Sequence, residues 1–119
     1  MNKGIISKIR VKTIIYDSNL DILELYAGSK THHCKTIGDL LIVHCNEKNK
    51  IVGLEFLDIS RVYNIDKSIL NKLKSAKIII NKIPEQKKMF ITAKLFSLLE
   101  NKELTLLTDS SVEAPLITN

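Results

Sequence analysis

The sequence predicts a mainly β (α+β) protein: an antiparallel β-meander with one short helix and a C-terminal β-hairpin. Three observations lead to this fold class. Several segments alternate apolar and polar residues with a period of two, as half-buried strands do. Short runs of Asp, Asn, Ser and Gly, which favour turns, separate these segments. Only residues 66–75 combine helical apolar spacing with a suitable first residue.

The size and composition of the chain fit one soluble domain. It has 119 residues, of which 45% are hydrophobic and 26% charged. We therefore expect a single domain over residues 1–119, with the meander at 8–62 and the helix and hairpin at 63–119 completing its core. The apolar runs are too short to span a membrane, and no signal peptide is recognisable. These features predict a cytoplasmic protein without membrane association.

Five antiparallel strands are expected in the N-terminal half. They run over residues 8–16, 22–26, 32–37, 40–45 and 51–59. In the first strand, Ile9, Val11, Thr13 and Ile15 share one face, which predicts that this side faces the core. Gly53 lies inside the last strand, where a glycine indicates a bulge or a close backbone approach.

The third and fourth strands flank Gly38-Asp39, which suits a two-residue hairpin turn. This turn pairs His33 with His44 and so sets the faces on which the His and Cys side chains lie. One face is expected to carry His32, Cys34 and Cys45, and the other His33 and His44. Imidazole and thiolate are zinc ligands, so either set could hold a metal. The competing interpretation is a buried Cys45 and a solvent-facing histidine pair. No metal or cofactor is assigned.

The C-terminal half is expected to add one helix and three strands. Asp66 is a good N-cap for a helix over residues 66–75, and residues 78–80 form a strand. Residues 85–100 fit both a strand and a helical stripe, and we favour the strand because Phe-Ile-Thr prefers it. After a turn at 100–102, residues 104–108 return as its hairpin partner. The tail at 109–119 is either a short edge strand or loose.

Two phrases in the N-terminal half resemble a known family. They are Tyr16-Asp17 with Asp21, Leu23 and Leu25, and then the run Ile51-Val52-Gly53-Leu54-Glu55-Phe56-Leu57-Asp58. Over residues 8–62 this pattern resembles the small prokaryotic β-domains called domain of unknown function 2283. Here Glu24, His44 and Asn49 replace the family's aromatic residue, aspartate and glycine. The resemblance implies a β-fold and no reaction, and it suggests a partner in a two-protein module of the toxin–antitoxin type.

The carboxylates of these phrases are the candidates for acid–base catalysis, which needs two carboxyl groups in one pocket. We expect instead that Asp17 and Asp21 cap turns and that Glu24 and Glu55 lie on solvated strand faces. The sequence therefore predicts no enzyme and no catalytic residue. The structural residues of the motif are Tyr16, Asp17, Asp21, Gly53 and Glu55.

The net charge of +5 raises a second possibility. Lys72, Lys74 and Lys77 lie towards the C-terminal end of the expected helix and could contact phosphates. A nucleic-acid surface would gather them with Lys35, Lys48 and Lys50. Only 5% of residues are aromatic, so few rings are available to stack on bases.

We therefore expect a non-enzymatic interaction protein. The open edges of a meander favour pairing with a second copy, as in a homodimer, or with a partner protein. A basic nucleic-acid-binding module is the alternative, and a metal-binding protein that uses the His/Cys hairpin is the third possibility.

Overall fold

A computed structural model describes residues 4–109 of the chain, which form two antiparallel sheets and a few short helices. The first part of the chain forms β1 (Ile5–Arg10), β2 (Thr13–Asp17), β3 (Ile22–Tyr26), β4 (His33–Ile37), β5 (Leu41–Cys45) and β6 (Ile51–Phe56). Then follow the helices α1 (Ile59–Val62) and α2 (Lys67–Leu70), the strand β7 (Leu73–Ile83), a 3-10 turn (Pro84–Gln86), β8 (Lys88–Ser97) and β9 (Asn101–Asp109). The mainly β fold class is confirmed.

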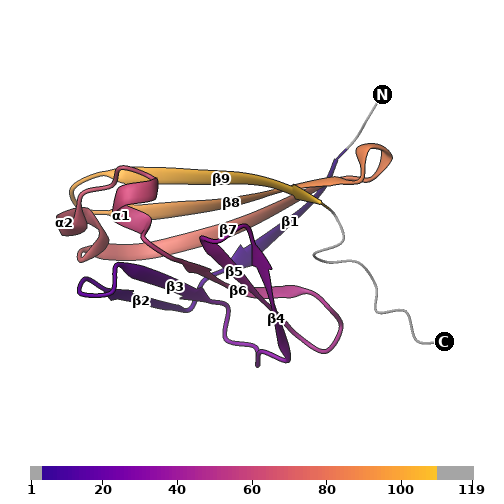
Figure 1. Ribbon diagram of the computed structural model, residues 1–119, viewed down its shortest axis with the longest axis horizontal. Helices are drawn as coiled ribbons and strands as arrows, with labels where there is room; N and C mark the ends of the chain where they lie inside the picture. The colour runs from indigo at the N-terminus through magenta and orange to yellow at the C-terminus, as the bar shows by residue number, and fades with distance from the viewer. Residues whose placement is uncertain (1–3, 110–119) are drawn as a thin grey trace.

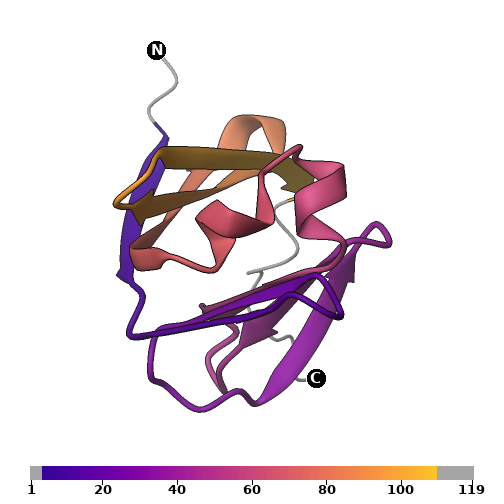
Figure 2. The same cartoon turned by 90° about the vertical axis from the view of Figure 1, so that its left-hand side faces the viewer.

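The two sheets face each other and enclose the core. The four-stranded sheet has the order β1-β7-β8-β9, and the five-stranded sheet has the order β2-β3-β6-β5-β4. Figure 1 shows the long strands of the first sheet above the shorter strands of the second. Figure 2 shows the two helices between the sheets, where they close one end of the sandwich. One hydrophobic cluster joins the elements, and its largest buried side chains are Leu23, Leu25, Leu41, Leu54, Phe56, Ile59, Leu70, Ile78, Ile80, Met89, Ile91 and Leu95.

Residues 8–16 are not one strand, and this expectation is wrong. The chain leaves the four-stranded sheet after Arg10 and enters the five-stranded sheet at Thr13. The crossing shifts the alternation by one residue. Ile14 and Tyr16 pack against the core, whereas Ile15 is 45% exposed. The inward positions therefore change from odd to even across the break.

The five strands of the N-terminal half are antiparallel, but their order is not that of a meander. The strand β6 lies between β3 and β5 rather than at an edge. Five of its six residues are buried, and a strand buried along most of its length is suited to the centre of a sheet. It also ends at Phe56, three residues before the predicted end at Ile59. Asp58 adopts the left-handed conformation (φ 52°), and α1 begins directly after it.

The single helix expected over residues 66–75 is shorter, and α1 precedes it. Asp66 is the N-cap of α2, as predicted, because its side chain accepts a hydrogen bond of 2.9 Å from the Ser68 N–H. The helix ends at Leu70, and β7 begins at Leu73. Pairing of Leu73 and Ser75 with β8 overrides the helical pattern there. The lysines assigned to a helix end therefore lie on the strand or just before it.

The strand predicted for residues 85–100 is confirmed, and so is the C-terminal hairpin of β8 and β9. The turn falls at residues 98–100, slightly before its predicted place. Of the tail predicted at 109–119, residues 110–119 lie outside the described residues. Within residues 4–109, no helix is long and apolar enough to cross a membrane.

Candidate functional site

Asp21 is the centre of a buried hydrogen-bond cluster that joins three elements. Its carboxylate accepts the Tyr16 hydroxyl at 2.7 Å, the Ser60 hydroxyl at 2.7 Å and the Ser60 N–H at 3.2 Å. Its own peptide oxygen accepts the Ile59 N–H at 3.1 Å. Asp58, the N-cap residue of α1, makes no side-chain capping bond. Asp21 therefore serves as the remote cap of this helix, across 39 residues of sequence.

The acid–base properties of this cluster follow from its contacts. Burial alone would raise the pKa of Asp21, but the hydrogen bonds from Tyr16 and Ser60 outweigh it and lower that pKa below its ordinary value. Burial, and then the bond to Asp21, raise the pKa of the Tyr16 phenol. Asp17 caps the same turn, since its Oδ1 accepts the N–H groups of Asn19 and Leu20 at 2.9 and 3.0 Å. The cluster is built to hold the turn and helix together.

The hairpin of β4 and β5 has a different register from the predicted one. Its turn has three residues, Gly38 to Leu40, and Gly38 takes the left-handed conformation (φ 59°). Cys34 therefore lies opposite His44, and His33 lies opposite Cys45. The extra turn residue shifts every pair by one position and moves side chains between faces.

This register separates the predicted metal ligands. Cys45 is fully buried in the core, whereas Cys34 is exposed on the outer face. His33 turns to the other side, where its Nε2 lies 2.8 Å from Oδ1 of the buried Asn49. Asn49 has φ 60°, a conformation that asparagine tolerates better than most residues. His32 contacts His33 at an Nδ1–Nδ1 distance of 3.3 Å. Within residues 4–109, no group of three His, Cys, Asp or Glu side chains could hold a metal ion.

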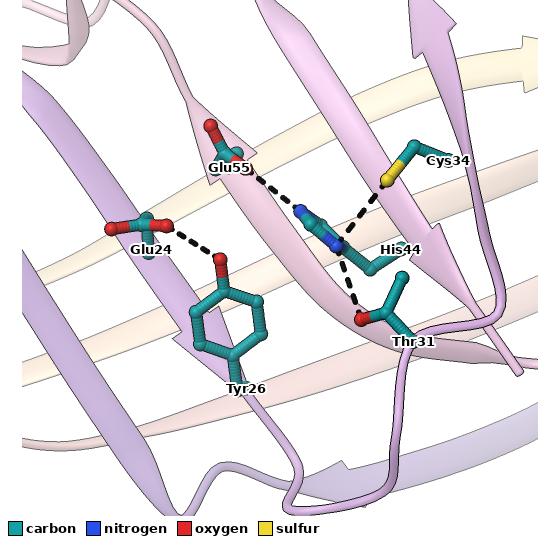
Figure 3. A network of polar contacts seen from close by, with 6 residues as sticks. All are labelled: Glu24, Tyr26, Thr31, Cys34, His44 and Glu55. Carbon is teal, nitrogen blue, oxygen red and sulfur yellow. Dashed lines mark hydrogen bonds and ion pairs between the residues drawn. The ribbon is translucent and has the colours of Figure 1, made fainter.

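The outer face of the five-stranded sheet carries a polar network around His44, which Figure 3 shows in close-up. Its Nε2 lies 2.8 Å from Oε1 of Glu55. Its Nδ1 lies 3.2 Å from Oγ1 of Thr31 and 3.5 Å from Sγ of Cys34. We call these four residues, together with Glu24 and Tyr26, the His44 network. It brings a thiol, an imidazole and a carboxylate into one line across three neighbouring strands.

Glu24 and Glu55 lie directly opposite each other on β3 and β6, an arrangement of like charges that is unfavourable without compensation. Each carboxylate therefore has its own partner. The Tyr26 hydroxyl donates to Glu24, and His44 contacts Glu55. Burial, followed by the bond to Glu24, raises the pKa of Tyr26. These glutamates are half-buried and paired, not simply solvated as the sequence predicted.

Gly53 lies between Tyr26 and His44 in the same row of the sheet. A Cβ atom there would lie 2.6 Å from Cδ1 of Tyr26 and 3.1 Å from the Leu25 oxygen. The ring centroids of Tyr26 and His44 are 5.2 Å apart in an edge-on contact. The register also shifts beside Gly53, between His44 and Cys45. Both sequence interpretations of this glycine, a close approach and a bulge, therefore hold.

A separate basic pocket lies where the chain crosses between the two sheets. It has a volume of about 510 Å³ and is lined by Lys8, Ile9, Arg10, Val11, Lys12, Ile14, Lys74, Ser75, Ala76 and Lys77. Ile9, Val11 and Ile14 supply apolar surface, and the five cations surround it. No carboxylate is among the described residues that line it. An anion with an apolar portion would match this combination.

The pocket only partly agrees with the predicted lysine cluster. Lys74 and Lys77 line it, but Lys72 does not. Lys35 lies on β4, at the opposite edge of its sheet from β2, and Lys48 lines a different hollow beside Lys30. Lys8, Arg10 and Lys12 join the pocket instead. These three cations occupy every second position of the sequence, and a strand presents alternate residues on one side. The sequence alone could therefore have grouped them.

Comparison with known proteins identifies part of the chain. Residues 13–60 match the family described as "Protein of unknown function (DUF2283)". No curated protein and no solved structure matches the chain. The matched segment begins at the first residue of β2 and ends within the first turn of α1. It therefore includes the whole five-stranded sheet, the Asp21 cluster and the His44 network. Residues 13–60 of this chain are a DUF2283 family segment.

Proposed function

We propose that this chain is a non-enzymatic cytoplasmic interaction protein that pairs with a second copy through β1. The observation that carries the proposal is the exposed start of this strand. Ile5 and Ile6 are 57% and 60% exposed, although both belong to a regular strand. β1 is an edge of the four-stranded sheet, so its outer side has no partner strand among the described residues. Such an edge is a template for another strand.

Two copies of β1 can pair across a two-fold axis, because an antiparallel strand is complementary to itself. Pairing centred on Ile6 places the two Ile6 side chains opposite each other, and it places Ile5 opposite Ser7 of the second copy. It places Lys8 opposite Gly4 of the second copy, so like charges do not oppose each other. The two four-stranded sheets would then form one continuous sheet, and the apolar side chains would leave water.

Light scattering after size-exclusion chromatography, at low and high salt on nuclease-treated protein, tests this proposal. We expect a dimer at both salt concentrations, since strand pairing and apolar contact are weakly screened. Ile6→Lys introduces a charge at the centre of the pairing and should yield a monomer. Leu98→Lys is the matched control, because Leu98 is 81% exposed in the β8–β9 turn and should leave the dimer intact. A wild-type monomer throughout would contradict the proposal.

A second candidate function is binding of nucleic acid, which the basic pocket favours. Five cations surround it, and none forms an ion pair with a described residue. Arg10 lies directly opposite Lys77, and Lys77 lies opposite Lys94, so a basic row continues across the sheet. This arrangement suits a phosphate backbone more than a single small anion.

Fluorescence anisotropy with a labelled single-stranded RNA, titrated at several salt concentrations, tests this candidate. We expect affinity to fall with salt, and Lys77→Gln to reduce the slope by about 0.7, the value for one phosphate contact in a single strand. Lys48→Gln removes the same charge outside the pocket and should bind as the wild type does. Equal losses in both variants would remove the pocket from consideration.

A further inference from the structure

We propose that Cys34 is a reactive thiol, deprotonated by His44, which forms a mixed disulfide with a low-molecular-weight disulfide. The proposal begins with the line of three groups in the His44 network (Figure 3). Cys34 Sγ lies 3.5 Å from Nδ1 of His44, and Nε2 of the same ring lies 2.8 Å from Glu55. A nucleophile beside a base, with a third group that orients the base, is the arrangement that activates a thiol.

The contacts of the imidazole fix which nitrogen is the base. An ionised carboxylate only accepts hydrogen bonds, so the Nε2 atom that faces Glu55 carries the hydrogen. The neutral ring then has its lone pair on Nδ1. This lone pair faces Cys34 and the hydroxyl of Thr31, which lies 3.2 Å away. Glu55 therefore holds His44 in the tautomer that can take a proton from the thiol.

The sulfur of Cys34 is open to solvent, whereas its base and the carboxylate that orients the base are shielded, as thiol–disulfide exchange requires. The side chains of His44 and Glu55 are 12% and 20% exposed, so the base and the carboxylate that orients it are largely shielded from water. Cys34 is exposed, and it lies on β4, an edge of the five-stranded sheet. A small disulfide can reach its sulfur from solvent. The ring of Tyr26 lies edge-on to His44 and helps to fix its position.

The position of the second cysteine determines the product. Cys45 is fully buried on the opposite face of the sheet and lies one position away from the partner of Cys34. It cannot approach Cys34 as a resolving thiol without a change in the hairpin. The disulfide formed at Cys34 therefore joins the chain to an external thiol.

The thiol–disulfide exchange needs no oxidant or reductant other than the external disulfide. Nδ1 of His44 accepts the Sγ proton, and the thiolate attacks one sulfur of the external disulfide. The new bond joins Cys34 to that sulfur, and the old S–S bond breaks. The departing thiolate takes a proton from the imidazolium and leaves as a thiol. Cys34 is thereby oxidised, and one half of the small disulfide is reduced.

Thiol kinetics test the proposal. The probe is dithionitrobenzoate, an aromatic disulfide that releases a coloured thiolate, and its rate of reaction with native protein is followed across pH. We expect one thiol per chain to react and Cys34→Ser to abolish that reaction. His44→Gln should slow it by about 100-fold or more at neutral pH, the size of a general-base contribution. This deficit should shrink above the ordinary thiol pKa of about 8.5, where ionisation needs no base.

Two further variants separate this mechanism from a structural effect. Glu55→Gln presents an amide that can donate to or accept from the ring, so part of the His44 population protonates Nδ1 and the rate should fall. His32→Gln is the matched control, because His32 contacts His33 and not the thiol. Mass spectrometry after incubation with glutathione disulfide should place one adduct on Cys34. Wild-type kinetics in His44→Gln at every pH, or an equal reaction at Cys45, would overturn the proposal.

Discussion

At the scale of single residues, the family motif is mainly a set of hydrogen bonds between distant parts of the chain. Asp21 receives the hydroxyls of Tyr16 and Ser60 and the backbone of α1. The sequence indicated the capping role of Asp21, but it did not indicate Ser60 as a partner of that carboxylate. Its partner is 39 residues away, and the strand order that brings them together could not be derived from local patterns.

Replacement of Asp21 should reveal this role through pH. Asp21→Asn keeps a residue that tolerates the left-handed φ of 56°, but it loses the negative charge and replaces one of the two acceptor oxygens with an NH₂ donor. We expect a loss of about 1–3 kcal/mol in the free energy of unfolding at neutral pH. The folded-state pKa of Asp21 is lowered, so its stabilisation is fully present above the ordinary value of 3.8 and is lost as pH falls through the lower folded value.

Urea unfolding of wild type and Asp21→Asn from neutral pH to below 3.8 checks this prediction. The difference between the two proteins should be constant near neutrality and shrink in acid. Asp39→Asn, at an exposed position in the β4–β5 turn, is the control and should show little change. A difference that grows in acid would show that the ionised carboxylate is not the stabilising form.

At the scale of elements, the alternation of apolar and polar residues predicted where the strands occur. It did not predict which strands pair or in which register. Residues 85–100 form a strand as expected, because β8 alternates buried and partly buried side chains. The β4–β5 register failed by one residue, since Gly38-Asp39 alone does not show that Leu40 joins the turn. That single error placed Cys34 on the wrong face and hid the His44 network. The basic pocket was not predicted either, because residues 8–16 were expected to form one strand. The pocket lies where the chain crosses from β1 to β2.

The central position of β6 predicts that its buried side chains contribute more to stability than side chains of an edge strand. Leu54 is fully buried between Leu25 and Val43 on the neighbouring strands. Leu54→Ala should reduce the free energy of unfolding by about 2–5 kcal/mol, the cost of a core cavity. Ile15→Ala on the edge strand β2 removes a side chain that is 45% exposed and should cost about 0.5 kcal/mol or less. Equal costs in urea denaturation would contradict a central role for β6.

At the scale of the whole molecule, the segment that matches the family is one layer of a two-layer structure. Residues 13–60 supply β2 to β6. The opposite sheet takes β1 from before this segment and β7 to β9 from after it. The core is shared, since Leu25 and Phe56 from one sheet join the same cluster as Ile78 and Ile91 from the other. The sequence motif therefore marks half of the sandwich.

This shared core predicts that residues 13–60 do not fold alone. Without the second sheet, the inner faces of β3, β5 and β6 would be open to water, and their burial is the main source of stability. The fragment retains Tyr16, Asp21 and Ser60 but ends inside α1, so a second fragment of residues 13–63, which completes this helix, distinguishes loss of the other layer from loss of the capped helix. We expect no cooperative transition in a urea titration followed by circular dichroism, whereas the full chain should show one. A sigmoidal transition in the fragment would mean that the family segment is an autonomous domain, and that the four-stranded sheet is an addition to it.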